Sequence, residues 1–340
     1  MAIIILEKTK VDISKGIEKE GEIITTGIAE KEGKYIRAVE LVSPQGYFNT
    51  DSNITIQEFV GNKIILIDFW TYSCINCQRT LPYLNAWYER YEDEGLVIIG
   101  IHTPEFEFEK DYNNVKKAID KYDIKYPIVQ DNNYATWRAY KNNYWPRKYL
   151  IDIDGYVVYD HIGEGNYKET EIKIKELLKE RNERLNATNQ IGVDLTSPKV
   201  NNTNFNKIAT PEIYFGYEFS RNQIGNSEGW IKDKVINYEI DEKMKDNQFY
   251  LNGSWKNNPD NMELVSDTGD ISIVYSAKEI NLVAGAEAPV NLNISIDGKK
   301  VKTLIIRDYG LYNLFTDSYT KHKISITAEK GLKAYTFTFG

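Results

Sequence analysis

The chain has 340 residues, of which 41% are hydrophobic and 13% aromatic, and its formal net charge is −8. This length favours two domains, each with enough apolar residues for a core of its own. The negative charge, without a local basic patch, argues against nucleic-acid binding, and two cysteines exclude a disulfide-stapled scaffold or a four-cysteine zinc module.

The first 50 residues contain short runs of strand-forming residues separated by turns rich in Lys, Glu and Gly. We interpret these runs as an N-terminal β elaboration of the first domain. They are Ala2–Leu6, Glu22–Thr26 and Tyr35–Val42.

The segment Ile64–Trp70 is almost entirely apolar and too short to cross a bilayer, which predicts a buried strand of an α/β sheet. Cys74-Ile75-Asn76-Cys77 follows three residues later. Apolar residues then recur on one face and predict a helix over 77–93, which Pro82 would kink. Both cysteines of the chain therefore lie where a buried strand passes into a helix.

Strands and helices alternate beyond this helix, which predicts a sheet covered by helices on both faces. The dipeptide Asp154-Gly155 predicts a late hairpin and makes the sheet mixed. The predicted strands are Leu96–Ile101, Tyr126–Val129, Lys148–Asp152 and Tyr156–His161, and the predicted helices are Asn113–Lys121, Tyr134–Lys141 and Tyr167–Leu185.

The sequence changes character after the last of these helices. Residues 188–207 are polar and lack periodicity, as expected of a linker between a domain at 1–187 and one at 208–340. The second domain has runs that alternate at period two and no helical pattern, which predicts a β jelly roll or sandwich. Its clearest strands are 271–275, 291–296 and 335–339, with turn signals at Asn252-Gly253, Asp297-Gly298 and Lys330-Gly331.

The cysteine pair has the spacing that thiol–disulfide exchange requires. Cys74 at the helix start is the candidate nucleophile, because the helix N-terminus favours thiolate over thiol. Cys77, one turn further on, is the candidate resolving thiol. Asp68 lies on the buried strand, where its pKa should be raised, and is the candidate general base toward Cys77.

These residues resemble the thioredoxin superfamily. The stretch IDFWTYSCINC is similar to the family's strand and C-x-x-C signature, with Asp68 at the position of the buried acid and Pro82 at that of the helix kink. Trp145-Pro146 stands where the family has a cis-proline beside the substrate chain. The resemblance therefore implies a thioredoxin-like fold, with Pro146 and Trp145 contacting substrate.

Within this superfamily the chain resembles the TlpA-like branch. The segment HTPEFEFE is similar to that branch's extra segment and places Glu105 as an acid near the active site. More closely, residues 45–340 resemble the soluble C-terminal part of the DipZ family, through blocks such as YWPRKYLID and HIGEGNY. That resemblance implies a TlpA-like domain followed by a jelly roll similar to carbohydrate-binding modules. Nothing in the sequence resembles the membrane domain of that family.

Other interpretations of the same residues stay open. The two cysteines could form a structural disulfide, although so short a loop adds little stability, or could bind metal with His102 and His161, whose spacing fits no zinc pattern. A peroxidase motif fails at Ile67, where proline is required. Two interpretations stay open for the aromatic residues as well. A substrate groove could be bordered by Trp70, Tyr72 and Trp145, or these residues could pack in the core. Sugar rings could stack on Trp230 and Trp255, or these two could also pack in the core.

The sequence predicts a thiol–disulfide oxidoreductase that needs no cofactor or metal beyond the redox-active pair Cys74–Cys77. The residues between the cysteines, Ile75 and Asn76, include no His, which favours a reductant of protein disulfides served by an electron donor. The alternative is a module that binds glycan or protein, with a secondary or regulatory redox pair. No signal peptide or membrane span is predicted, so the expected location is cytoplasmic, or extracytoplasmic, as the resemblance implies, if a leader was removed.

Overall fold

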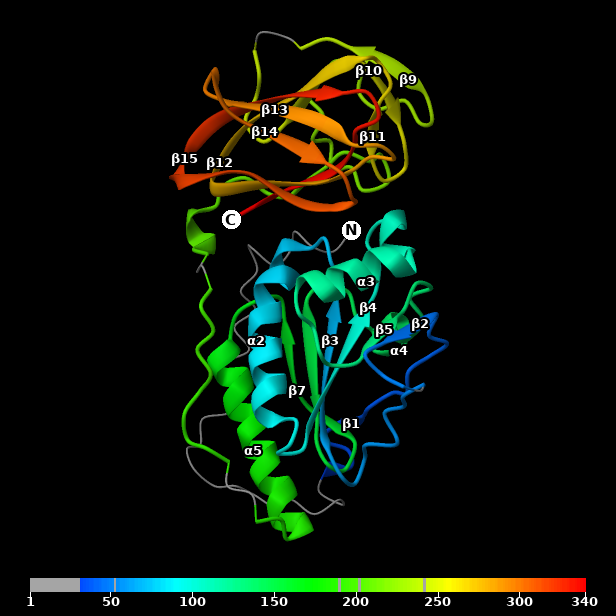
Figure 1. Ribbon diagram of the computed structural model, residues 1–340, viewed down its shortest axis with the longest axis vertical. Helices are drawn as coiled ribbons and strands as arrows, with labels where there is room; N and C mark the ends of the chain where they lie inside the picture. The colour runs from blue at the N-terminus through cyan, green and yellow to red at the C-terminus, as the bar shows by residue number, and fades with distance from the viewer. Residues whose placement is uncertain (1–30, 52, 189–190, 201–202, 241–242) are drawn as a thin grey trace. The chain divides into compact units, whose positions relative to one another are not determined.

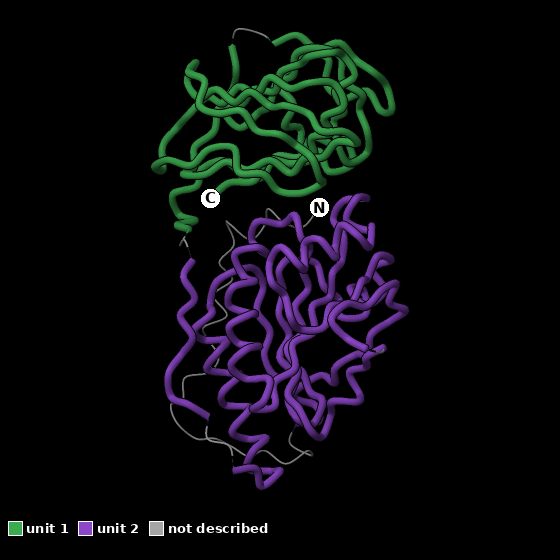
Figure 2. The backbone as a smooth tube through the Cα atoms, in the orientation of Figure 1, with its two compact units in different colours: residues 1, 3–9, 202–340 green, residues 2, 10–201 purple. Residues whose placement is uncertain are grey.

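The computed structural model describes residues 31–340, except 52, 189–190, 201–202 and 241–242. It divides into two compact units that part at residues 201 and 202 (Figure 2). Two of the predicted N-terminal strands, Ala2–Leu6 and Glu22–Thr26, lie outside the described residues. No helix in the described part of the chain is both long and apolar enough to span a membrane.

A seven-stranded mixed sheet forms the centre of the first unit (Figure 1). Strand β3 (Ile64–Trp70) lies in its middle, and all seven of its residues are buried, which confirms the predicted strand. It pairs in parallel with β4 (Leu96–His102) and antiparallel with β6 (Arg147–Ile151). The strand order is β1-β7-β6-β3-β4-β5-β2, with β1 (Ile36–Arg37), β2 (Gly46–Phe48), β5 (Ile128–Gln130) and β7 (Tyr156–Ile162).

Helices cover both faces of this sheet because successive residues of β3 point to opposite sides. Leu66 packs in a cluster with residues of α2 (Ile75–Tyr91), α3 (Tyr112–Lys121) and α5 (Tyr167–Leu185). Ile67 packs instead in a cluster that includes Trp137 of α4 (Ala135–Ala139). In Figure 1, α2 and α5 run together along one side of the sheet. The predicted mixed sheet flanked by helices is confirmed.

Most boundaries in this unit differ from the prediction by one or two residues, and three differences have local reasons. Helix α2 begins at Ile75 rather than residue 77, since Cys74 already caps it. The predicted strand Tyr35–Val42 is reduced to the two residues of β1, which pair with β7 at the sheet edge. Between β4 and α3 the chain forms a short 3₁₀ helix, η2 (Glu107–Lys110), that the sequence did not predict.

Within its described residues, the second unit is formed by strands, apart from one 3₁₀ turn, η3 (Phe205–Lys207). Its sheet has the order β14-β13-β15-β12-β10-β11-β16-β8, and β9 pairs with β10. The long strands β12 and β15 pair along most of their length. The strands are β8 (Ile213–Tyr214), β9 (Val235–Tyr238), β10 (Phe249–Asn257), β11 (Met262–Leu264), β12 (Thr268–Gly285), β13 (Val290–Ile296), β14 (Lys299–Ile306), β15 (Gly310–Glu329) and β16 (Lys333–Phe339).

Two of the three turn signals in this unit connect strands, and one does not. Asp297-Gly298 joins β13 to β14, and Gly331 lies between β15 and β16. Asn252-Gly253, however, lies within β10, so the predicted turn is wrong. Gly253 has φ +92°, and a Cβ there would meet Ser266 Oγ at 2.9 Å, so the glycine permits a local irregularity in a continuous strand.

The two tryptophans considered for sugar stacking pack inward. Trp255 is fully buried, and its indole Nε1 donates a hydrogen bond to the Asn252 carbonyl at 2.9 Å. Trp230 is half-buried and donates to the Phe215 carbonyl at 2.8 Å. The core-packing alternative therefore applies to Trp255, and Trp230 packs against the same core with part of its side chain exposed.

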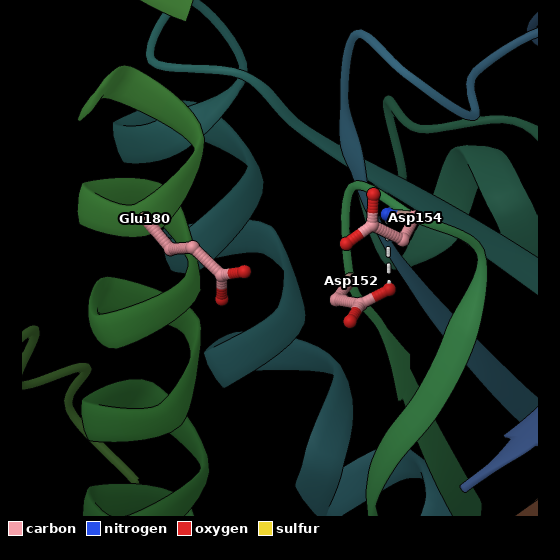
Figure 3. Close-up of side chains that lie close together, drawn as sticks. All are labelled: Asp152, Asp154 and Glu180. Carbon is pink, nitrogen blue, oxygen red and sulfur yellow. Dashed lines mark hydrogen bonds between the residues drawn. The ribbon is translucent and has the colours of Figure 1, made fainter. Parts of the chain in front are cut away.

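A buried ionic cluster ties the turn between β6 and β7 to α5. Figure 3 shows Asp152 and Asp154 on that turn, with Glu180 of α5 pointing toward them. These are the acidic groups in the described residues that lie close enough to share a metal ion. The ammonium of Lys31 lies among them, with Nζ–O distances of 2.7, 3.0 and 2.8 Å. The cation of this cluster is therefore a side chain of the protein.

We expect Lys31→Met to lower the free energy of unfolding by about 3 kcal/mol, because it leaves the buried carboxylate of Asp152 without its cation, while Arg184 still pairs with Asp154. Lys116→Met is the matched control, since its partner Asp120 is exposed, and this change should cost less than about 0.5 kcal/mol. Urea titration of both variants measures the difference. Equal effects of the two substitutions would contradict this prediction.

Candidate functional site

Cys74 and Cys77 occupy different environments in the same helical turn. Cys74 is the N-cap of α2, and its Sγ accepts a hydrogen bond from the Cys77 backbone N–H at 3.3 Å. It is partly exposed, whereas Cys77 is only 1% exposed. Both are free thiols in this structure. The unpaired amides at the helix start thus surround the sulfur that substrate can reach.

Burial of Cys77 raises the pKa of its thiol well above the usual value. The neighbouring Cys74 and, to a smaller extent, the charge of Asp68 raise it further. Cys77 therefore keeps its proton at neutral pH until a base accepts it.

Asp68 is a buried carboxylate whose charge acts on Cys77. It lies on β3 and is 1% exposed, and burial raises its pKa to about 6. The cation Lys148 opposes this effect of burial. A carboxyl group with a pKa near 6 is largely ionised at pH 7 and is still a stronger base than an ordinary aspartate.

Lys148 is a member of the site that the sequence did not reveal. It stands opposite Asp68 in the pairing of β3 with β6, and its side chain is fully buried. Its Nζ lies 3.7 Å from Asp68 Oδ1, a distance for an ion pair rather than a hydrogen bond. Burial lowers the pKa of Lys148, while the charge of Asp68 raises it. From sequence, a lysine in a strand is usually expected at the surface. Only the register of β3 with β6 places Lys148 next to Asp68.

The peptide bond between Trp145 and Pro146 is cis, as the family resemblance implied. Pro146 immediately precedes β6, and its carbonyl accepts a hydrogen bond from Gly163 N–H at 2.8 Å. The indole of Trp145 is partly exposed, donates to the Thr103 carbonyl at 3.0 Å and packs on Trp137. Trp145 is therefore available to contact substrate.

Trp70 and Tyr72 are not exposed in the same way. Trp70 is 1% exposed and Tyr72 5%, and both rings pack on His102. Their predicted contact with substrate is corrected in favour of core packing, because the ring of His102 and the surrounding cluster cover them. Both residues belong to the same core cluster as Cys77.

The predicted acid Glu105 and its neighbour Glu109 differ in what they contact. Glu105 is partly buried, and its backbone N–H donates to Glu109 Oε2 at 2.6 Å. Glu109, four residues later, is fully buried and accepts a hydrogen bond from the hydroxyl of Ser73 at 2.7 Å. Glu109 thus bonds directly to the residue before Cys74, and the sequence analysis missed it. An acid at the third position of a 3₁₀ turn is the signal that could have indicated it.

The two histidines considered as metal ligands have other partners. His102 Nε2 accepts a hydrogen bond from the Tyr72 N–H at 3.3 Å, and burial lowers the pKa of His102 to about 3. Burial also lowers the pKa of His161 to about 4. Within the described residues, the group of side chains that could share a metal ion includes neither cysteine.

Two family models match the chain. The AhpC/TSA family model matches residues 37–160, and the model described as a thioredoxin-like C-terminal domain matches residues 210–340. These matches agree with a thioredoxin-like α/β fold in the first unit and with a separate strand-rich second unit.

Curated relatives extend the comparison. Protein DipZ of Mycobacterium tuberculosis is 36% identical over 310 residues, which cover 89% of this chain and 43% of that protein. The chain thus spans less than half the length of that relative. Thiol-disulfide oxidoreductase YkuV of Bacillus subtilis is 29% identical over 141 residues, which cover 42% of the chain and 93% of YkuV. A solution structure of a thioredoxin-like protein in the oxidised form is 28% identical and has a TM-score of 0.40. The match covers 43% of this chain and 97% of the chain in that structure.

The raised pKa of Asp68 has a measurable consequence for stability. Its folded value of about 6 exceeds the unfolded value of about 3.9, so folding takes up a proton between these values. This group therefore makes the folded protein less stable as pH rises from about 4 to 6.

We expect the difference in free energy of unfolding between Asp68→Asn and the wild type to move in favour of the variant by about 2 kcal/mol between pH 4 and pH 7. Denaturant titrations of both proteins across this range measure it. A difference that does not change with pH would show that Asp68 titrates normally.

Proposed function

We propose that this chain, a member of the thioredoxin superfamily, is a dithiol–disulfide oxidoreductase that reduces disulfide bonds in proteins. One observation carries the proposal. A partly exposed cysteine caps a helix, a buried partner thiol lies one turn below it, and a buried carboxylate lies beside that thiol. This arrangement supplies the nucleophile, the resolving thiol and the base that exchange requires.

In the first step, the Cys74 thiolate attacks one sulfur of the substrate disulfide. A bond forms between Cys74 Sγ and that sulfur, and the other substrate sulfur leaves as a thiolate that takes a proton. The helix N-terminus stabilises negative charge on Cys74 before the attack.

In the second step, Asp68 takes the proton of Cys77, and the Cys77 thiolate attacks Cys74 Sγ. The mixed disulfide breaks, and the second substrate sulfur leaves as a thiolate. The substrate has gained two electrons and two protons, and the enzyme is left with a Cys74–Cys77 disulfide. A donor of two electrons must then reduce this disulfide before another turnover.

Residues beside the cysteines favour binding of an extended protein chain. Pro146 is cis and buried, the partly exposed Trp145 stands before it, and Trp145 and Cys74 pack on the same core cluster, so a substrate segment that contacts Trp145 could also reach Cys74. Ile75 and Asn76, between the cysteines, add no cationic charge that would stabilise the thiolate further, which supports a reductant rather than a strong oxidant. Glu105 lies in the segment between β4 and η2, where its backbone N–H bonds Glu109, and we propose it as an acid near the active site.

For the second unit we propose a role in binding, separate from the redox chemistry of the first unit. Its long antiparallel strands are compatible with the jelly roll of carbohydrate-binding modules. Trp255 is fully buried and Trp230 only partly exposed, so a glycan would need other residues of the unit as well. We therefore assign the redox activity to residues 37–160 and propose that the second unit binds the partner that carries the substrate disulfide.

Cys77→Ser should accumulate a mixed disulfide between Cys74 and substrate, because the second attack is lost while the first remains. Cys74→Ser should form none and should lose insulin reduction by at least about 1,000-fold. Mass spectrometry of non-reduced adducts, together with insulin turbidity, checks both outcomes. A substrate adduct on the Cys74→Ser variant, or full activity of that variant, would overturn the proposed function.

Lys148→Met should move the acidic limb of the resolving step to higher pH, because loss of the cation raises the pKa of Asp68 above about 6. Asp68→Asn should slow resolution by about 100-fold at pH 7, in the range of general-base effects. Lys168→Met removes a charge from an exposed position of α5 and is the control. Stopped-flow measurement of mixed-disulfide decay from pH 5 to 9 measures all three. Unchanged profiles in both test variants would exclude Asp68 as the base.

A further inference from the structure

Glu109 is a buried acid outside the cysteine–aspartate pair that nevertheless touches the catalytic loop. It lies in η2, the 3₁₀ helix after β4, and its side chain is fully buried. The residue it contacts, Ser73, immediately precedes Cys74 in the sequence. A segment remote from the C-x-x-C motif is thereby joined to the residue next to the nucleophile.

The carboxylate of Glu109 receives hydrogen bonds from two segments of the chain. Oε1 accepts from the Ser73 backbone N–H at 3.2 Å and from the Ser73 hydroxyl at 2.7 Å. Oε2 accepts from the backbone N–H groups of Glu105 at 2.6 Å and Phe106 at 3.0 Å. The two oxygens therefore clamp the loop before Cys74 to the segment that follows β4.

This set of partners fits an ionised carboxylate. Three of these contacts come from backbone N–H groups, which can only donate, and a carboxylate offers acceptors alone. The pKa of Glu109 is raised overall, because the effect of burial exceeds that of the hydrogen bonds from Ser73 and its other donors, which lower it. The described residues place no Lys or Arg within ion-pair distance of Glu109, so no side-chain cation cancels its charge.

Other titratable groups around this acid do not replace its charge. Tyr134 faces Glu109 and Glu105 from the segment before α4, and burial raises its pKa. His102, which contacts the same loop from β4, has a pKa of about 3 and is neutral at pH 7. The carboxylate of Glu109 thus supplies the negative charge that bonds directly to the residue before Cys74.

We propose that Glu109 is a positioning residue that fixes the Ser73–Cys74 loop and, through its buried negative charge, keeps the cysteine pair reducing. A nearby anion disfavours the thiolate of Cys74, so the reduced form is less stabilised and the reduction potential is lower. The inference rests on the proposed role of Cys74 as the nucleophile. Glu109 acts through Ser73 and touches no reacting atom.

Two substitutions separate charge from geometry. Glu109→Gln keeps the size of the side chain and removes its charge, so the potential should rise, with the equilibrium against glutathione shifted about tenfold or ~30 mV. Glu109→Asp keeps the charge but is too short to hold all its partners, so activity should fall while the potential does not rise. Glu107→Gln removes a charge from a side chain that is 77% exposed, two residues away, and should leave the potential unchanged.

The direction of the change decides the outcome. A role limited to holding the loop predicts that Glu109→Gln leaves the potential unchanged or lowers it, since a loosened loop loses the helix N-terminus; either result overturns the proposal. In the wild type, ¹³C NMR of the Glu109 carboxyl, assigned through its bonded neighbours, should show the ionised form at pH 7. A protonated Glu109 at that pH would also overturn it, whether or not the variants fold.

These measurements are independent of the insulin assay. The potential and the carboxyl titration are defined even if the chain reduces no protein disulfide, in which case the proposed function fails and the electrostatic effect of Glu109 is still measured. A normal insulin assay with an unshifted potential in Glu109→Gln rejects only the inference about Glu109.

Discussion

The ion pair between Asp68 and Lys148 is the constraint on which the rest of the site depends. Two fully buried charges are costly, and either one alone would neutralise itself by a shift in pKa. The antiparallel register of β3 with β6 places them opposite each other, so each limits the shift of the other. The result is a buried carboxyl group that titrates near neutral pH beside Cys77 rather than remaining always protonated.

The same region explains why two cysteines three residues apart behave differently. Helix α2 begins at Ile75, so Cys74 lies outside the first turn as its cap and Cys77 lies within it, facing β3. Helix geometry alone therefore gives one sulfur contact with solvent and amide groups and gives the other contact with the core. The division of labour between nucleophile and resolving thiol needs no further residue.

The sequence predicted those parts of the structure that short-range patterns determine. Strand β3 and helix α5 were predicted to the residue, because an unbroken apolar run and a regular amphipathic repeat each specify one element. Asn252-Gly253 failed because pairing on both sides of β10 outweighs the turn preference of a dipeptide. The cysteines, Asp68 and Pro146 belong to a recognisable sequence motif. Lys148 and Glu109 do not. Lys148 reaches the site through the register of β3 with β6, and Glu109 through a contact with Ser73, 36 residues earlier in the sequence.

The loop before Cys74 is held from β4 and its continuation by two groups of different electrical character. The neutral imidazole of His102 accepts from the Tyr72 N–H, and the carboxylate of Glu109 accepts from Ser73. Because both groups are acceptors, they satisfy successive backbone N–H groups of the loop, and only one of them brings a charge. The charge on this side of the loop is negative, while the nearby N-terminus of α2 carries the positive end of the helix dipole. Under the proposed role of Glu109, a change in β4 or η2 would alter the surroundings of a redox pair whose own sequence stays the same.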